Sequence, residues 1–329
     1  MPDSHHPMTP VSAIVLSYNI PTMLLECVKS LLIQPEITEI IIIENGSTHP
    51  DMEATYAQIQ SIPTSIHIRI LVANPALSYS AAHNWGLDEC VNELVLLINN
   101  DAKLHGHVLV HAVHLMEDYP NIGIVGARIL NPDMTVNHLG LIPKPHTIGY
   151  EHIGRGLPAM AAYPVHIPDV AAVTAACVLL RRTHLRFDPT YWFALEDTDL
   201  CFQYLQAKFE IAVCSDFVAI HPESTTRATV QEVNREWAVK QAHGTHYFKR
   251  KWRSQWIKDW MRFMPYFLKI PDDRIRTHVL NLFSTWGGIA LLLIIASWLP
   301  IIAEWLFITV VTMGLFWLLR SIIRWILGS

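Results

Sequence analysis

The stretch Leu94-Val95-Leu96-Leu97-Ile98-Asn99-Asn100-Asp101 decides the fold that the sequence predicts. Its five apolar residues, rich in Leu and Ile, predict a strand buried on both faces, as the central strands of parallel sheets are. The run stops on two amides and a carboxylate, so Asp101 stands at the carboxyl end of this strand. Open α/β sheets bind ligands at that edge, where Asp101 is suited to hold a divalent cation on a diphosphate. The alternative is that Asn99, Asn100 and Asp101 only form the turn that closes the strand.

Three further strands, each followed by a helix, precede this stretch. We expect strands at residues 11–18, 39–44 and 66–72, and helices at 23–33, 51–60 and 80–90. Strands that alternate with helices in this way predict βαβ units, an α/β fold and a mostly parallel central sheet.

Polar residues also close two of these earlier strands, and they suit a nucleotide. Ser17, Tyr18 and Asn19 close the first strand, and Glu44 closes the second. Neither Gly-x-Gly-x-x-Gly nor Gly-x-x-x-x-Gly-Lys occurs, which disfavours a nicotinamide dehydrogenase or a P-loop NTPase. Without such a glycine loop to cradle a diphosphate, we expect a metal to neutralise it, and Asp101 is the candidate ligand.

The second half of the predicted domain adds carboxylates beside aromatic residues. Residues 131–168 are rich in Gly, Pro and His and predict an extended excursion over the sheet, and 170–181 predicts a strand of small residues around Thr174 that lets a sugar approach closely. Trp192 then precedes Glu196 and Asp197 at the start of a predicted helix. The helix dipole alone favours acids in a first turn. A carboxylate beside Trp can instead have a raised pKa and serve as a general base for a sugar hydroxyl.

Histidines occur in two settings. His221 follows an apolar run at 209–220 that predicts a pair of strands, so it is either structural or meets Asp101 at the same sheet edge. A second set lies on a helix predicted at 106–118, where a metal cluster is conceivable but a solvated helix face is the favoured interpretation. This set comprises His105, His107, His111 and His114.

Composition separates an acidic body from a basic, apolar tail. Residues 249–329 carry a net charge of +7 and residues 1–248 a net charge of −12, which together give the −5 of the whole chain. This layout argues against a nucleic-acid partner and favours a domain held on an anionic membrane face. The five cysteines form no Cys-x-x-Cys pair, so we expect buried free thiols in a reducing cytosol. Residues 1–10 are polar and predict a disordered start without a signal peptide.

The tail predicts membrane contact in two ways. Over 249–275, Trp252, Trp256, Trp260, Phe263 and Phe267 form a stripe with basic flanks that is typical of an interfacial helix, although packing against the catalytic domain is the alternative. Within 276–329, the stretches 280–298 and 301–319 are each long enough to cross a bilayer. Their flanking arginines place both ends in the cytosol, and a re-entrant hairpin is the alternative.

These motifs resemble glycosyltransferase family 2, the inverting enzymes of the GT-A fold, and especially its rhamnosyltransferase-like branch. The resemblance covers residues 11–227, and it rests on six segments in the family's order. They are Leu16-Ser17-Tyr18-Asn19, Glu44-Asn45-Gly46-Ser47, the segment from Ser78 to Gly86, Asn99-Asn100-Asp101, Glu196-Asp197-Thr198-Asp199-Leu200, and His221.

The resemblance implies a role for each matched residue. Asp101 and His221 would bind magnesium or manganese, and Asp197 would deprotonate the acceptor hydroxyl. Residues at the strand ends and in the segment before Gly86 would bind the donor, and three residues would face the acceptor. The donor-binding set is Ser17, Tyr18, Asn19, Glu44, Asn84, Asn99, Asn100 and Asp101; the acceptor-side set is Glu196, Trp192 and Thr174.

Three departures from the family's pattern bear on these roles. Glu44 replaces Asp, which lengthens the reach to the nucleoside. The segment after Asn74 carries about two extra residues, with Ala or Ser where the family usually has Gly. Asn99 replaces the first acid of the Asp-x-Asp motif, which removes a charged metal ligand and leaves Asp101 and the diphosphate to hold the cation.

We therefore expect residues 11–248 to form a GT-A glycosyltransferase domain, anchored through the tail with its catalytic part on the cytosolic side of the cell's inner or plasma membrane. It would move a sugar from a nucleotide donor, such as dTDP-rhamnose or a UDP-sugar, to a lipid-linked or polysaccharide acceptor. The rivals are a polyprenyl-phosphate glycosyltransferase, whose phosphate nucleophile needs no base, and a catalytically degenerate nucleotide-sugar-binding scaffold. The sequence leaves open the donor, the acceptor and the oligomeric state.

Overall fold

The computed structural model describes residues 9–144, 149–160, 163–168, 170–191, 194–222 and 234–269. The chain divides into two compact units, Met1–Phe263 and Met264–Ser329. The first unit contains the sheet and every candidate site residue that is described. Of the second unit, only the end of helix α8 is described.

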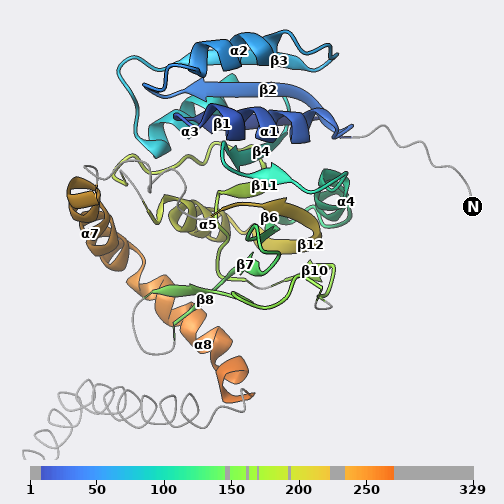
Figure 1. The fold of residues 1–329 in the computed structure, drawn as a ribbon. Helices are drawn as coiled ribbons and strands as arrows, with labels where there is room; N and C mark the ends of the chain where they lie inside the picture. The colour runs from blue at the N-terminus through green and yellow to red at the C-terminus, as the bar shows by residue number, and fades with distance from the viewer. Residues whose placement is uncertain are drawn as a thin grey trace, which may run out of the picture. The chain divides into compact units, whose positions relative to one another are not determined.

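A single large sheet forms the centre of the first unit (Figure 1). Within the described residues its strands run in the order β10-β12-β6-β11-β4-β1-β2-β3, with β5 beside β12 and β7 beside β6. A separate hairpin joins β8 and β9. The strands are β1 (Val11–Ser17), β2 (Ile37–Glu44), β3 (His67–Val72), β4 (Leu94–Asn99), β5 (Lys103–Leu104), β6 (Ile122–Leu130), β7 (Val136–His138), β8 (Leu141–Pro143), β9 (Tyr150–His152), β10 (His166–Ile167), β11 (Cys177–Arg181) and β12 (Glu210–Ile220).

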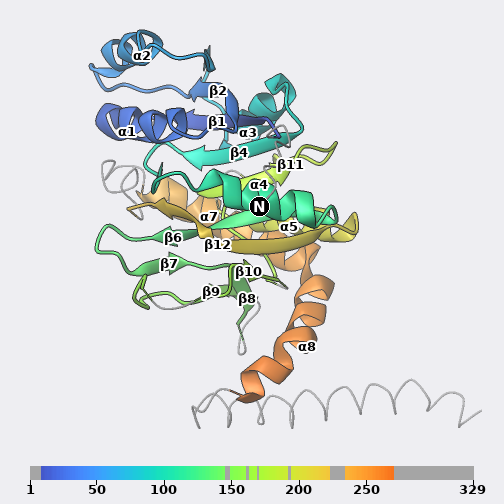
Figure 2. The same ribbon diagram turned by 90° about the vertical axis from the view of Figure 1, so that its right-hand side faces the viewer.

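Helices cover both faces of this sheet (Figures 1 and 2). On one face, residues of α1, α2 and α4 form a core together with Ile40 and Ile42 of β2. On the other face, residues of α3 and α5 form a core together with Ile41 and Ile43. Strand β2 is therefore apolar at successive positions because both of its faces are buried. The described helices are α1 (Pro21–Leu32), α2 (Met52–Gln60), α3 (Tyr79–Glu89), α4 (Leu109–Asp118), α5 (Glu196–Gln206), α7 (Asn234–Lys251) and α8 (Arg253–Lys269).

The α/β prediction is confirmed, and the predicted mostly parallel sheet is a mixed one: β6 and β12 are parallel to each other, whereas β5, β7, β10 and β11 are antiparallel to their partners. Strands β3, β2, β1 and β4 are parallel. Strand β11 then runs antiparallel to both β4 and β6, so the sheet is mixed. The physical reason is the connection, since residues 131–176 return through several short strands rather than through one crossover helix, which a parallel strand would need.

Two predicted segments also differ in detail. Residues 209–220 form one strand, β12, with an irregularity in its pairing between Cys214 and Val218, rather than two strands. The small-residue strand predicted at 170–181 begins only at Cys177, and the residues before it form a buried loop that makes one isolated bridge, between Ala172 and Leu141.

The stripe of aromatic residues in the tail meets protein where its side chains are described. Trp252 is only 4% exposed and packs edge-on against Phe202 of α5. The Trp256 indole donates a hydrogen bond to the backbone carbonyl of Gly149 (3.2 Å), and Asp259, also buried, accepts one from the Tyr150 hydroxyl (3.0 Å). The prediction of a lipid-facing stripe is therefore wrong for Trp252, and packing on the domain explains this face of α8.

In the described part of the chain, no helix combines the length and the apolar composition that a membrane crossing requires. The two stretches predicted to span, 280–298 and 301–319, lie outside the described residues, as does the start of the chain to residue 8.

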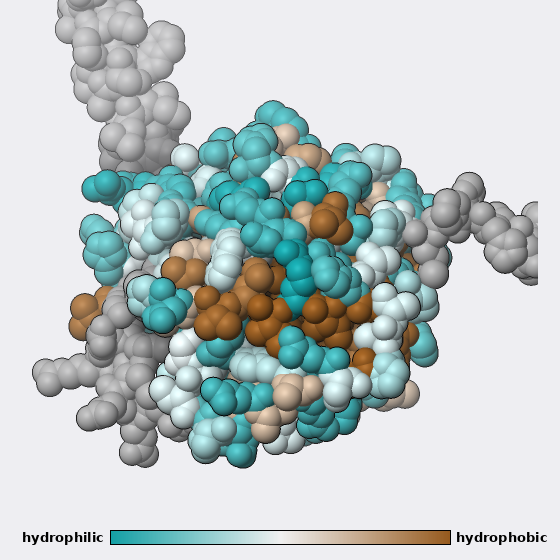
Figure 3. Space-filling model, turned by 90° about the horizontal axis from the view of Figure 1, so that it is seen from above, coloured by the Kyte–Doolittle hydropathy of each residue, from teal (hydrophilic) through white to brown (hydrophobic). Residues whose placement is uncertain are grey.

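The exposed surface and the cysteines agree with the simpler interpretations. All four histidines from His105 to His114 are exposed, and the described residues contain no group of three potential ligands, so the solvated-face interpretation holds there. All five cysteines are free and buried. Seen from above, apolar side chains gather over α2 and β3 (Figure 3), where β3 ends the sheet and Val72 is 65% exposed.

Candidate functional site

Seven of the predicted residues meet at one edge of the sheet because the register of three parallel strands aligns their ends. Ser17 pairs with Glu44, and Leu16 pairs with Asn99, so β1, β2 and β4 finish at the same level. We call this set the strand-end group: Ser17, Tyr18, Asn19, Glu44, Asn99, Asn100 and Asp101.

The Glu44 carboxylate is fixed by hydrogen bonds from its own loop and from α2. It accepts from the backbone N–H of Ser47 (2.5 Å), from the Ser47 hydroxyl (2.9 Å), and from the hydroxyl of Tyr56. The Tyr56 hydroxyl also lies 2.8 Å from the Ser17 hydroxyl. Burial and the Glu44 carboxylate raise the pKa of Tyr56, so this phenol stays protonated. The sequence analysis missed Tyr56, whose position on α2 gives no signal by itself.

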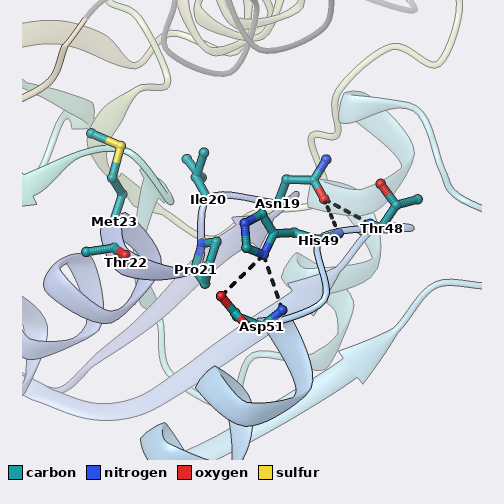
Figure 4. Close-up of a pocket in the computed structure, with 8 residues that line it drawn as sticks. All are labelled: Asn19, Ile20, Pro21, Thr22, Met23, Thr48, His49 and Asp51. Atoms are coloured by element: carbon teal, nitrogen blue, oxygen red, sulfur yellow. Dashed lines mark hydrogen bonds and ion pairs between the residues drawn. The ribbon is translucent and has the colours of Figure 1, made fainter.

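Asn19 joins the loop after β1 to the loop after β2. Its side-chain oxygen accepts hydrogen bonds from the backbone N–H groups of Thr48 (2.8 Å) and His49 (2.9 Å), as Figure 4 shows. Asn19 and Ile20 both have positive φ angles, 55° and 49°, which a β-branched residue such as Ile20 rarely adopts. Backbone strain of this kind collects at functional sites.

These residues line an open cavity of about 520 Å³ between the start of α1 and the loop after β2 (Figure 4). His49 points toward Asp51 across its floor, with the two side chains 4.0 Å apart. The cavity adjoins the strand-end group through Asn19, so it offers room beside that group for part of a ligand.

Asn45 and Gly46 fix the third loop of this edge. The Asn45 side chain makes two hydrogen bonds to the backbone of Leu77, at 2.7 and 3.0 Å. Gly46 has φ of +81°, and a Cβ added there would lie 2.9 Å from the Cβ of Ala76. Only glycine suits both conditions, so this Asn-Gly pair holds the loop with the extra residues against the strand ends.

Asp101 and His221 meet at the end of the sheet. The Asp101 carboxylate and the His221 Nε2 atom are 3.0 Å apart, with side-chain exposures of 6% and 14%. The backbone N–H of His221 donates to the carbonyl of Leu130, which extends β12 beside β6. The sheet thus brings together two residues that are 120 positions apart.

The Asp101–His221 pair fits a divalent cation that is held jointly by protein and ligand. It supplies one carboxylate oxygen and one imidazole nitrogen, and among the described residues no third His, Cys, Asp or Glu completes a cluster. Magnesium sites commonly combine one or two carboxylates with phosphate oxygens of the substrate, and an imidazole nitrogen is a ligand for transition-metal ions, so the pair suits manganese best. Asn100, whose amide donates to the backbone carbonyls of Tyr18 (3.3 Å) and Asn19 (3.5 Å), holds this turn to the first strand.

A second group lies at the start of α5, which we call the helix-start group: Glu196, Asp197, Thr174 and Ala175. The Asp197 carboxylate accepts hydrogen bonds from the backbone N–H groups of Ala175 (3.3 Å) and Thr198 (2.7 Å) and remains partly exposed. Glu196 is buried. The predicted acceptor-side residue Thr174 therefore lies beside Asp197, as the chain brings the loop before β11 against α5.

Tyr79 links the two groups and was not among the predicted site residues. It begins α3 directly after the N-cap Ser78. Burial raises the pKa of Tyr79 well above its usual value, and the carboxylates of Glu196, Asp197 and Asp101 raise it further. Backbone hydrogen bonds also join the two groups, because the Asn99 N–H donates to the Ala176 carbonyl (3.0 Å) and the Ala175 N–H donates to the Asp197 carboxylate (3.3 Å). Tyr79 lies within the segment that resembles the family, so a signal was present in the sequence. Its position in that segment did not indicate a role in the site.

Two other predicted site residues, Asn84 and Trp192, belong to neither group. Both polar groups of the Asn84 side chain bond the backbone of Phe187, each at 2.8 Å, so this amide holds the loop before α5 against α3. Its predicted contact with a donor has no support in these bonds. Trp192 lies outside the described residues.

Comparison with known proteins agrees with this arrangement. Residues 12–160 match the family described as Glycosyl transferase family 2. This segment holds the whole strand-end group and Tyr79, whereas the helix-start group and His221 lie beyond it. Over these residues, which make up somewhat less than half of its length, the chain is thus similar to glycosyl transferase family 2.

Two curated proteins are similar over about two thirds of the chain. An uncharacterized protein, y4gI, of Sinorhizobium fredii is 25% identical over 232 residues, and the O-antigen biosynthesis protein RfbC of Myxococcus xanthus is 26% identical over 231 residues. These matches cover 67% and 66% of this chain. They span only 25% and 18% of the two relatives, which are much longer proteins.

Solved structures share the fold. The mannosyltransferase PcManGT from Pyrobaculum calidifontis, solved with GDP-Man and Mn2+, has a TM-score of 0.53 at 15% identity and covers 87% of this chain and 79% of its own. GalNAc-T7, solved with UDP, GalNAc and Mn2+, has a TM-score of 0.55 at 9% identity and covers 66% of this chain and 44% of its own. At these identities the likeness concerns the fold alone, which is GT-A-like.

Proposed function

We propose that this protein is a glycosyltransferase that moves a sugar from a nucleotide diphosphate donor to an acceptor hydroxyl, with inversion at the anomeric carbon. The domain match supports the transferase class. The single observation that carries the reaction is that backbone hydrogen bonds join the two groups. The Asn99 N–H donates to the Ala176 carbonyl (3.0 Å), and the N–H of the adjacent Ala175 donates to the Asp197 carboxylate (3.3 Å).

The strand-end group is the proposed donor site. Glu44, held by Ser47 and Tyr56, presents a fixed carboxylate to the nucleoside, and the cavity beside Asn19 gives room for it. The ligands of the two neighbouring structures, UDP and GalNAc in one and GDP-Man in the other, support a donor of this chemical class.

Asp101 and His221 would hold a magnesium or manganese ion on the donor diphosphate. Such an ion, when bound, supplies charge stabilisation to the departing nucleoside diphosphate. The Mn2+ in both neighbouring structures supports this proposal. Asn99 stands where a second acid would add charge. We therefore propose Asp101 as the one carboxylate of the strand-end group that would bind the ion.

Asp197 is the proposed general base. Its carboxylate is oriented by two backbone N–H groups and is partly exposed, so it is fixed and yet accessible to an acceptor. It takes the proton of the acceptor hydroxyl as that oxygen forms a bond to the anomeric carbon. The bond from this carbon to the diphosphate oxygen breaks on the opposite face, and the nucleoside diphosphate leaves with its electron pair.

The proposed acceptor is a lipid-linked sugar or a polysaccharide at the cytosolic face of a membrane. The name of the Myxococcus xanthus relative, which refers to O-antigen biosynthesis, supports a polysaccharide pathway. The net charge of +7 after residue 248 supports attraction to anionic lipid. On α8 the described face away from the sheet is also suited to such a surface, because basic Arg253, Lys258 and Arg262 alternate with exposed Ile257 and Met261.

The test is release of nucleoside diphosphate by the purified full chain. UDP-, dTDP- and GDP-sugars are screened with manganese or magnesium and a lipid extract as acceptor, for the wild type, Asp101→Ala and the control Asp118→Ala, an exposed acid at the end of α4. We expect release from one donor that requires the metal, is lost in Asp101→Ala and persists in Asp118→Ala.

Two results would count against this function. Release from no donor, together with nucleotide-sugar binding, would indicate a scaffold that binds the donor without turnover. Equal release by Asp101→Ala and the wild type would remove the proposed metal site while leaving the transferase class intact.

A further inference from the structure

A buried carboxylate two residues after Asp197 joins α5 to the C-terminal helices. Asp199 has no exposed surface. Its Oδ1 atom accepts hydrogen bonds from the Tyr191 hydroxyl (3.0 Å) and the Trp252 indole (2.5 Å), and its Oδ2 atom accepts from the Gln203 amide (2.8 Å). A buried charge is stable only when it is paired in this way.

Lys251 supplies the balancing charge and bridges two acids. Its ammonium lies 2.8 Å from Asp199 and 2.6 Å from Asp188, which also accepts a hydrogen bond from the Tyr247 hydroxyl (2.9 Å). Burial works against both charges, yet the hydrogen bond from Lys251 lowers the pKa of Asp188 to about 2, and the two acids raise the pKa of Lys251. We call Asp188, Tyr191, Asp199, Tyr247, Lys251 and Trp252 the Asp199 cluster.

The cluster spans the turn that leads into α5. Tyr191 lies before this turn, and Asp199 lies after it, in the first turn of the helix that carries Asp197. Between them Ala194 and Leu195 both have positive φ angles, 68° and 72°. Such a conformation costs each non-glycine residue free energy and persists only where the surroundings impose it.

The ends of that turn are held to α3 and to the junction between α7 and α8. The backbone carbonyl of Tyr191 accepts a hydrogen bond from the buried Ser80 of α3 (3.1 Å). Asp199 bonds Lys251 and Trp252, which are 52 and 53 residues further along the chain. Asp197 therefore lies in the first turn of α5, directly after a strained turn whose two ends are tied to α3 and to the C-terminal helices.

We propose that Lys251 and Trp252 are positioning residues for Asp197, so that the helices α7 and α8 are part of the acceptor half of the transferase site. The inference rests on the proposed function, because it assigns Asp197 the role of base. No residue of the strand-end group belongs to the Asp199 cluster. We therefore expect a substitution that disrupts the cluster to lower turnover and to leave nucleotide binding intact.

The experiment compares Lys251→Met with Lys251→Arg and with the control Lys249→Met, an exposed lysine two positions before Lys251 and outside the cluster. Lys251→Met leaves Asp188 and Asp199 without their shared cation, whereas Lys251→Arg keeps the charge. For each protein, binding of the matching nucleoside diphosphate with manganese is measured by calorimetry, and kcat and KM are measured for the transfer.

We expect kcat to fall by about 10² in Lys251→Met, the size that a misplacement of about 1 Å produces. The nucleotide Kd should stay within about twofold of the wild type, because the nucleotide site is unchanged. A twofold change in Kd corresponds to RT ln 2, about 0.4 kcal/mol of binding free energy. Lys251→Arg should recover part of kcat, and Lys249→Met should match the wild type. An unchanged kcat in Lys251→Met, or a parallel loss of nucleotide binding and turnover, would overturn the positioning role.

A second readout separates this inference from the proposed function. Amide hydrogen exchange at residues 194–199 is measured in the same variants, and it needs no activity. Faster exchange there in Lys251→Met, with unchanged exchange at residues 17–19 and 44–48, supports the coupling even if no donor is turned over. Unchanged exchange at 194–199 would overturn it even in an active transferase.

Discussion

The strand-end group and the helix-start group are held by different kinds of structure. In the first group, Glu44 bonds residues 3 and 12 positions away, and the strands themselves align Ser17 with Glu44. In the second group, Asp197 bonds Ala175, and the helix it begins is held by Lys251 and Trp252. The first group thus depends on the parallel sheet, and the second depends on a loop and on the C-terminal helices.

This difference teaches where each half of the site can fail. Parallel strands buried on both faces form the least yielding part of such a domain, so a change at a strand end is expected to stay local. The turn at Ala194 and Leu195 is not part of a β-sheet, so no strand pairing stabilises it, and it relies on contacts with residues far away in the sequence. Substitutions can therefore separate binding from turnover, which gives three ways to test the comparison.

The largest effect is expected at the proposed base. Asp197→Asn keeps the size of the side chain and removes its charge, so it should lower kcat by about 10²–10⁴, the usual contribution of a positioned base. Binding of the donor nucleotide should not change, because no strand-end residue bonds Asp197. Steady-state kinetics and calorimetry on the same preparation check both parts.

The matched control for this prediction is Asp216→Asn, a partly exposed acid of β12 outside both groups. Full turnover in Asp197→Asn would contradict the assignment of the base. It would favour a lipid phosphate as acceptor, since a phosphate nucleophile is already ionised and needs no base.

The contrast also explains what the sequence could predict. The ends of β1, β2 and β4 were predicted because apolar runs define the strands, and the parallel topology then fixes which residues meet. Asp101 and His221 were expected at one edge for the same reason, and they lie 3.0 Å apart. The order of strands beyond β4 was not predicted, because β11 reverses direction after a segment with no periodicity.

The missed contacts are side-chain pairs between elements that are distant in sequence. Tyr56 and Lys251 belong to helices whose patterns are ordinary, and only the assembled fold brings them to Glu44 and Asp199. The stripe that contains Trp252 shows the same limit. A row of aromatic residues with basic flanks is typical of a lipid surface and equally of a helix packed on its own domain, and Phe202 decides for the domain.

The second prediction concerns the loop that covers the strand-end group. Gly46→Ala should cost about 1–3 kcal/mol of stability, because alanine at φ of +81° is strained and its Cβ would meet Ala76 at 2.9 Å. Nucleotide affinity should fall with it. Gly106→Ala is the control, since Gly106 also has a positive φ, +90°, but no atom within 4 Å of an added Cβ.

Chemical denaturation and nucleotide titration of the two glycine variants separate the cost of the positive φ angle from the effect of the contact with Ala76. Both variants should lose stability, and only Gly46→Ala should weaken nucleotide binding. Equal nucleotide affinity in Gly46→Ala and the wild type would mean that the loop after β2 does not shape the strand-end group.

The smallest effect is expected between the two groups, at His83 of α3. This ring is fully buried, lies 4.1 Å from the ring of Tyr79 and 5.4 Å from that of Phe187, and has its Nδ1 atom 3.0 Å from the Tyr79 carbonyl. Burial lowers the pKa of His83 from 6.5 to about 4, because the charged form would lose its hydration. The folded protein therefore keeps this ring neutral where the unfolded chain protonates it.

The sign of the pH dependence follows. Between pH 6.5 and about 4 the unfolded state binds one more proton at this site, so the free energy of unfolding falls as the pH is lowered, by up to about 1.4 kcal/mol per pH unit. His83→Phe keeps a ring against Tyr79 and Phe187 and removes the titration, so its slope between pH 6.5 and 5 should be smaller by about 1 kcal/mol per pH unit. The exposed His111→Gln should retain the wild-type slope. If His83→Phe also retains the wild-type slope, the His83 ring is not held neutral in the folded protein. The packing of α3 around His83 would then be looser than its contacts with Tyr79 and Phe187 indicate.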